Sequence, residues 1–157
     1  MEQKTKIHAE DNKQELLITR EFDLPVELLF KAYTDPGIVE QWMGTKVLKL
    51  ENKKHGGYQF ETTDPMGNKH SFSGTIHGLV PNKAITRTFE MESTDFGPQL
   101  EFLEFETLSN STSKLTMHIV YRSVDIRDQI LKLPFARGIH MAHNRLQQIA
   151  NSLKQSL

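Results

Sequence analysis

The chain has 157 residues, and its 19 lysines and arginines nearly balance its 20 aspartates and glutamates, giving a formal net charge of −1 at pH 7. This balance argues against a strongly basic protein that binds nucleic acid or an acidic membrane surface. The chain contains no cysteine, which excludes disulfides, thiolate metal sites and cysteine nucleophiles. It also lacks the long apolar run of a membrane span and the apolar core of a signal peptide. We therefore expect one cytoplasmic domain over residues 1–157.

The first part of the chain is predicted to form one strand and two short helices. Residues 1 to about 14 are polar and are expected to be a loose N-terminal segment. A strand is predicted at residues 16–22. Pro25 suits the first turn of a helix, and Pro36 should end that helix. The second short helix then carries the only tryptophan, Trp42. The apolar residues of the first helix recur at helical spacing: Val26, Leu29, Phe30 and Tyr33.

The middle of the chain is predicted to consist of strands joined by tight turns. The pair Gly56-Gly57 permits a sharp bend or bulge, and the run from Asp64 to Asn68 is typical of a hairpin turn. Successive strands with hairpin turns indicate an antiparallel meander. The predicted strands are residues 46–52, 58–60, 69–80, 84–92, 99–108 and 114–122.

The end of the chain is predicted to be helical. Residues 124–132 suit a short helix, Pro134 should break it, and a long amphipathic helix follows over about residues 135–155. Together the elements predict an α+β helix-grip fold, with a curved antiparallel sheet of about six or seven strands wrapped around the C-terminal helix. Such a fold leaves a space between sheet and helix, which is either filled or hollow.

Several segments resemble one known family over about residues 16–155. They are the run Ile18 to Pro25, the pattern Phe30 to Pro36 followed by Trp42, the run His55 to Phe60, Gly74-Thr75-Ile76 with Leu79 and Pro81, and Gly138-Ile139 with Asn144-Arg145-Leu146 and Leu153. This set resembles the activator of heat-shock-protein-90 ATPase homologue (AHSA-type) family. That family belongs to the START-like, birch-pollen-allergen-like superfamily.

The resemblance implies a START-like fold and, through the family name, an association with a chaperone. The chain departs from the family pattern at two positions. Ile139 stands where the family often has tryptophan, and Gly78 stands where it often has an acidic residue. Because both positions are expected near the cavity or its rim, the ligand of a relative does not transfer to this chain.

Alternation along the strands and helical spacing select one set of side chains that would face a cavity. Ordinary core packing is the alternative role for these apolar residues, since cores and pockets are lined by the same residue types. The candidate ligand-cavity residues are Trp42, Tyr58, Phe60, Phe72, Ile76, Arg87, Phe89, Phe105, Met117, Ile119, Phe135, Ile139 and His143.

Two members of this set are polar enough to orient a ligand. Arg87 is in phase with apolar neighbours. It either faces inward and needs an anionic partner or ligand, or it points to solvent because the register is inverted or because it lies at a strand end. We favour the solvent-facing alternative. His143 flanks the apolar stripe of the last helix, where it is either a general base or a core-boundary histidine. Glu101, Glu104 and Glu106 are interpreted mainly as a solvent face.

Metal and cofactor chemistry are not expected. His140 and His143 have a spacing that can bind metal, but no third ligand is evident nearby. The chain lacks phosphate-binding, dinucleotide-binding, serine-hydrolase and zinc-protease motifs. We therefore assign no catalytic residue, no metal and no cofactor.

The leading hypothesis is a protein that binds a hydrophobic small molecule, lipid-like or polycyclic aromatic, between sheet and C-terminal helix, with a role in the stress response. One alternative is a chaperone-associated protein. Another is an enzyme of cyclase or aldolase type that uses His143. We expect a monomer or weak homodimer, and no nucleic-acid partner.

Overall fold

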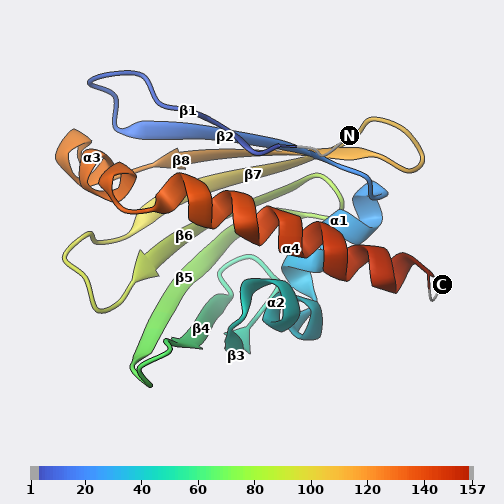
Figure 1. Ribbon diagram of the computed structural model, residues 1–157, viewed down its shortest axis with the longest axis horizontal. Coiled ribbons are helices and arrows are strands. Elements are labelled where there is room, and N and C mark those ends of the chain that lie inside the picture. The colour runs from blue at the N-terminus through green and yellow to red at the C-terminus, as the bar shows by residue number, and fades with distance from the viewer. Residues whose placement is uncertain (1–3, 156–157) are drawn as a thin grey trace.

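A single antiparallel sheet dominates the computed structural model, which describes residues 4–155 (Figure 1). Its eight strands lie in the order β1-β2-β8-β7-β6-β5-β4-β3. The strands are β1 (Lys6–His8), β2 (Glu15–Phe22), β3 (Lys46–Leu50), β4 (Gly57–Thr63), β5 (Lys69–Val80), β6 (Ala84–Met91), β7 (Gln99–Thr107) and β8 (Ser113–Val120). The helices are α1 (Val26–Thr34), α2 (Pro36–Met43), α3 (Val124–Lys132) and α4 (Phe135–Gln155).

The α+β helix-grip arrangement is confirmed. The long helix α4 crosses one face of the sheet, and α1 and α2 lie beside its C-terminal half (Figure 1). We call the face beneath α4 the inner face and the opposite face the outer face. None of the helices within residues 4–155 is both long and apolar enough to span a membrane.

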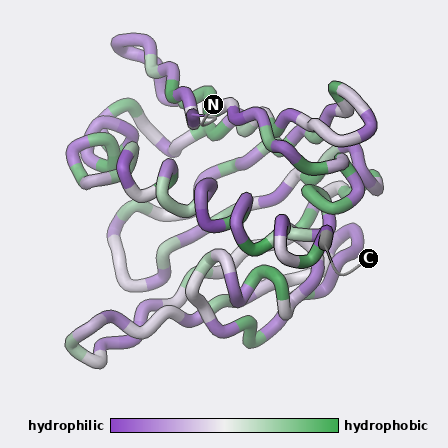
Figure 2. Tube along the Cα trace, turned by 45° about the vertical axis from the view of Figure 1, so that its right-hand side comes forward, coloured by the Kyte–Doolittle hydropathy of each residue, from purple (hydrophilic) through white to green (hydrophobic). Residues whose placement is uncertain are grey.

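The sheet has more strands than the six or seven expected, because the segment expected to be loose contributes one. Lys6–His8 pair antiparallel with β2, with His8 opposite Leu17. This pairing satisfies backbone N–H and C=O groups of β2 that an edge strand would leave open. The loop that follows β1 is largely hydrophilic and projects from the body of the protein (Figure 2).

Trp42 joins the two short helices. The side chain of Asp35 caps α2 by accepting a hydrogen bond from the backbone N–H of Ile38 at 3.2 Å. The indole Nε1 of Trp42 donates to the carbonyl oxygen of Ala32 in α1 at 2.7 Å, and its ring lies 5.1 Å from that of Tyr33. The buried Trp42 side chain therefore fixes α2 against α1.

Burial of the inner face is uneven along the sheet. In β8, inward-facing side chains from Leu115 to Ile119 are buried and alternate with half-buried outward ones. In β5 and β6, by contrast, the inward-facing Phe72, Phe89 and Met91 stay half-buried. The helix α4 shows the same gradient, since it is buried at His143, Leu146 and Ala150 from its middle onward, while Phe135 and Ile139 at its start are half-buried. The closed core thus lies at the β2–β8 side, and the inner face of β5 and β6 is only partly covered.

Candidate functional site

An ion pair lies within the inner face, where Arg87 of β6 is directly opposite Glu101 of β7. The Arg87 Nε donates to the Glu101 Oε1 at 3.0 Å, and the two side chains are only 11% and 5% exposed. The expectation that Arg87 points to solvent is therefore wrong, as is the interpretation of Glu101 as part of a solvent face. Glu104 and Glu106 are exposed as expected.

Neutral polar groups surround this pair. The guanidinium carbon of Arg87 lies 5.2 Å from the ring centroid of Tyr58, and Gln99 Nε2 donates to the second oxygen of Glu101 at 2.8 Å. The Tyr58 hydroxyl donates to the Thr88 carbonyl oxygen at 2.5 Å. Burial raises the pKa of Tyr58, so its phenol remains protonated at neutral pH.

Some hydrogen-bond donors near the Arg87–Glu101 pair have no acceptor among the described residues. The hydroxyl of Tyr121 is buried without a hydrogen-bond partner among the described residues. Burial raises its pKa, and the negative charge of Glu101 raises it further, so the hydroxyl stays a donor. The two terminal nitrogens of Arg87 form no hydrogen bond within residues 4–155. The buried, unpaired hydroxyl of Tyr121 costs about 1–3 kcal/mol, which a matching acceptor would recover.

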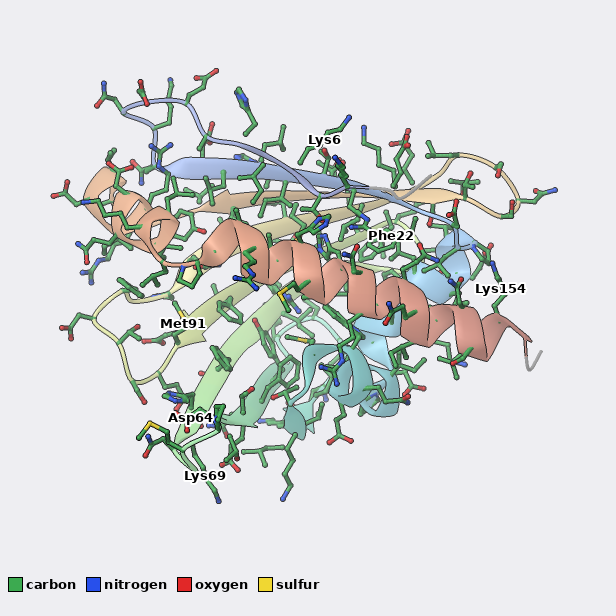
Figure 3. The ribbon with its side chains drawn as sticks, in the orientation of Figure 1. Lys6, Phe22, Asp64, Lys69, Met91 and Lys154 are labelled. Carbon is green, nitrogen blue, oxygen red and sulfur yellow. The ribbon has the colours of Figure 1, made fainter. Side chains whose placement is uncertain are left out.

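Aromatic side chains extend from the polar pair across the partly covered inner face. The rings of Phe72 and Phe89 stack with centroids 5.6 Å apart, and Met91 is paired opposite Phe72. In Figure 3, Met91 lies on one side of α4 and Phe22 on the other. We define the inner-face site by six residues: Tyr58, Phe72, Arg87, Phe89, Glu101 and Tyr121.

The structure divides the remaining candidate residues between packed core and rim. Ile139 and Phe135 of α4 are half-buried and pack against the core cluster. The fully packed candidates fall into two core clusters: Trp42, Phe105, Met117 and Ile119 in one, and Phe60 and Ile76, together with Tyr58, in the other.

His143 lies elsewhere, against β2. Its Nδ1 is 2.7 Å from the hydroxyl of Thr5, and its ring packs edge-on to Phe22 with centroids 5.6 Å apart. The side chain is 0% exposed, and burial, with smaller effects of the Arg20 and His140 charges, lowers its pKa to about 3. A buried, neutral imidazole with such a low pKa is a poor general base at neutral pH. The contacts of His143 are those of a core histidine.

Replacing His143 with glutamine is expected to remove a pH dependence of stability. The pKa of His143 is about 3 in the folded chain against an ordinary value of 6.5, so below pH 6.5 the unfolded state binds a proton that the folded state does not. The free energy of unfolding therefore falls on acidification, by up to about 1.4 kcal/mol per pH unit. Urea unfolding between pH 7 and about pH 5, where most carboxylates stay ionised, measures this slope.

The variant His77→Gln is the matched control, because His77 is an exposed histidine on β5. It should keep the slope of the native chain. An unchanged slope in His143→Gln would contradict a buried neutral His143.

Four polar members of the site region are absent from the candidate set: Tyr33, Gln99, Glu101 and Tyr121. Glu101 had a clear signal, because it shares strand parity with the inward-facing Leu103 and Phe105. Tyr33 packs against Trp42 and Phe105 from α1, a contact between distant segments that no local pattern reveals. Within residues 4–155, no group of three or more histidine, aspartate or glutamate side chains is arranged to hold a metal ion.

A long helix lying across a curved antiparallel sheet, with a partly covered inner face, defines a helix-grip domain of the START-like class. The family model described as activator of Hsp90 ATPase homolog 1-like protein matches residues 23–154, and the chain belongs to this family. No curated protein matches the chain.

Solved structures with the same fold come from several bacteria. A protein from Rhodobacter sphaeroides matches with a TM-score of 0.84 at 20% identity, covering 94% of this chain and 99% of that one. A Mycobacterium smegmatis protein matches with a TM-score of 0.81 at 22% identity, covering 96% and 99%. A solution structure from Arthrobacter aurescens gives 0.84 at 16% identity, covering 94% and 91%. These likenesses show the fold alone, and the family and fold fit a ligand-binding or chaperone-associated domain.

Proposed function

We propose that the protein binds an apolar small molecule with one polar end at the inner-face site, beneath the N-terminal half of α4. The partial burial of Phe72 and Phe89 supports this most directly. Inward-facing aromatic side chains on a sheet covered by a helix are normally removed from water, as Phe105 is on β7. Covering Phe72 and Phe89 with an apolar ligand gains roughly 25 cal/mol per Å² of surface buried.

The polar end of this ligand is uncharged. Arg87 and Glu101 neutralise each other, so the site offers no net positive charge to a carboxylate or phosphate. An anionic group would also be brought close to the buried Glu101 carboxylate, which disfavours it. A carbonyl or hydroxyl oxygen instead accepts hydrogen bonds from the Arg87 terminal nitrogens and the Tyr121 hydroxyl without adding charge.

A matched pair of probes tests this proposal. We expect 2-acetylnaphthalene, a neutral aromatic ketone, to bind saturably and to shift the amide resonances of Phe89 and Met91 in two-dimensional NMR spectra. The carboxylate 2-naphthoate should bind at least about tenfold more weakly, which corresponds to about 1.4 kcal/mol. Trp42 is a poor reporter, since its ring is fixed between α1 and α2.

Variants localise the binding. Phe89→Ala should weaken 2-acetylnaphthalene about tenfold by removing half of the aromatic stack. Leu48→Ala, at an exposed position of β3, should leave the affinity unchanged. The proposal would be wrong if neither probe bound saturably, or if Phe89→Ala and Leu48→Ala changed the affinity equally.

A further inference from the structure

The outer face of the sheet carries an apolar floor that the inner-face site does not use. Leu17, His118 and Phe102 lie opposite one another on β2, β8 and β7. The rings of Phe102 and His118 stack with centroids 5.7 Å apart and an angle of 28° between their planes, and Leu17 is 40% exposed. An aromatic ring and a leucine in one row on a solvent-facing surface form an apolar platform of the kind that marks a binding site.

The loop between β1 and β2 borders this platform on one side, and hydrogen bonds to Arg127 and Tyr121 hold the loop in place. Arg127 of α3, itself buried, donates through Nη1 to the carbonyl oxygens of Glu10 at 2.5 Å and of Glu15 at 3.4 Å. The Gln14 side chain donates to the Tyr121 carbonyl at 2.8 Å, and the Tyr121 N–H donates back to the Gln14 carbonyl at 2.8 Å. Figure 1 shows the loop at the same end of the sheet as α3.

Loop and platform together line a half-open pocket of about 320 Å³ on the outer face. This volume is at the small end of the range for ligand sites, and it suits a molecule of one or two rings. Because the loop is tied to α3 and to Tyr121 just after β8, the wall of the pocket is formed before any ligand arrives, which lowers the entropic cost of binding.

The charges around the pocket are mostly negative. Three carboxylates line it, those of Glu10, Glu15 and Glu104, against the single ammonium of Lys13. His118 is 2.9 Å from Glu15, and Glu10 is 3.7 Å from His8, while the Glu104 side chain is exposed. The three carboxylates and the one ammonium give a formal charge of −2, which attracts cations and repels anions.

We propose that this outer pocket binds a planar aromatic molecule that carries a positive charge, with its ring on the Phe102–His118 platform and its ammonium group towards Glu104 and Glu15. The platform supplies apolar contact and stacking, and the carboxylates select the charge. The site is separate from the inner-face site and does not depend on it.

Two probes with the same ring and opposite charges test this assignment on the full-length chain. Tryptamine should bind saturably and shift the amide resonances of Phe102, Thr116 and His118. Indole-3-propionate, whose side chain ends in a carboxylate, should bind at least tenfold more weakly. Raising the salt concentration should weaken tryptamine, because exposed charges are screened.

Two substitutions on one strand provide the matched comparison. Glu104→Gln should weaken tryptamine about threefold, whereas Glu106→Gln, an exposed glutamate of β7 that does not line the pocket, should leave it unchanged. Phe102→Ala should abolish measurable binding, with folding checked by the NMR spectrum. Equal affinity for both probes, equal effects of the two glutamine variants, shifts confined to the inner face, or no saturation would each overturn the proposal.

Discussion

Arg87→Met is expected to lower the free energy of unfolding by about 3–5 kcal/mol, because it leaves the Glu101 carboxylate buried without its cation. The guanidinium and carboxylate are in hydrogen-bond contact at 3.0 Å, and both side chains are largely removed from water. Gln99 still donates one hydrogen bond to Glu101 in the variant, but a neutral amide does not compensate a buried charge. Urea denaturation monitored by circular dichroism measures the change as a shift in the unfolding midpoint.

The double variant Arg87→Met with Glu101→Leu tests whether the stability lost in Arg87→Met comes from the unpaired, buried charge of Glu101. Removing both charges leaves no uncompensated group, so the double variant should be clearly more stable than Arg87→Met alone. The double-mutant cycle then gives a coupling free energy of up to about 3 kcal/mol. If the destabilisations of the two single variants simply add, Arg87 and Glu101 do not form the coupled pair described above.

Gly74→Ala is expected to cost about 3 kcal/mol or to prevent folding. A Cβ at this position would lie 2.0 Å from the backbone oxygen of Thr88 and 2.7 Å from the ring and hydroxyl of Tyr58. Relief requires moving the β6 backbone or the Tyr58 ring, which also breaks the hydrogen bond from Tyr58 to Thr88. Thermal unfolding measures the loss, and NMR shifts of β4 and β6 report the displacement.

Gly138→Ala is the control for this prediction. The added Cβ of Gly138 has no atom within 4 Å, and the residue lies inside α4. Alanine should therefore stabilise the chain by about 0.5–1 kcal/mol through helix propensity. A Gly74→Ala protein as stable as the native chain would show that the close approach of Tyr58 to β5 is not required.

The contrast between Arg87 and His143 shows which side-chain contacts can be predicted from the local sequence pattern. Strand parity places Arg87, Glu101 and Phe105 on one face, and the antiparallel meander makes β6 and β7 neighbours. The ion pair could therefore have been predicted by applying the same alternation to Glu101 as to Leu103 and Phe105. His143 flanks the apolar stripe of its helix, but its partner Thr5 is 138 residues away in sequence.

The sequence by itself determined the elements from residue 16 onward and most of their faces, with β1, Arg87 and Glu101 as the exceptions. Proline and glycine positions, turn residues and the periodicities of strand and helix are set by contacts between near neighbours, so they are readable along the chain. Only the tertiary structure decided which part of the inner face α4 covers. The covered area of the inner face depends on how β1, β2 and β8 pair side by side and on where α4 crosses the sheet. These contacts join segments far apart in sequence. That arrangement packs Trp42 and His143 into the fold and leaves Phe72 and Phe89 partly open.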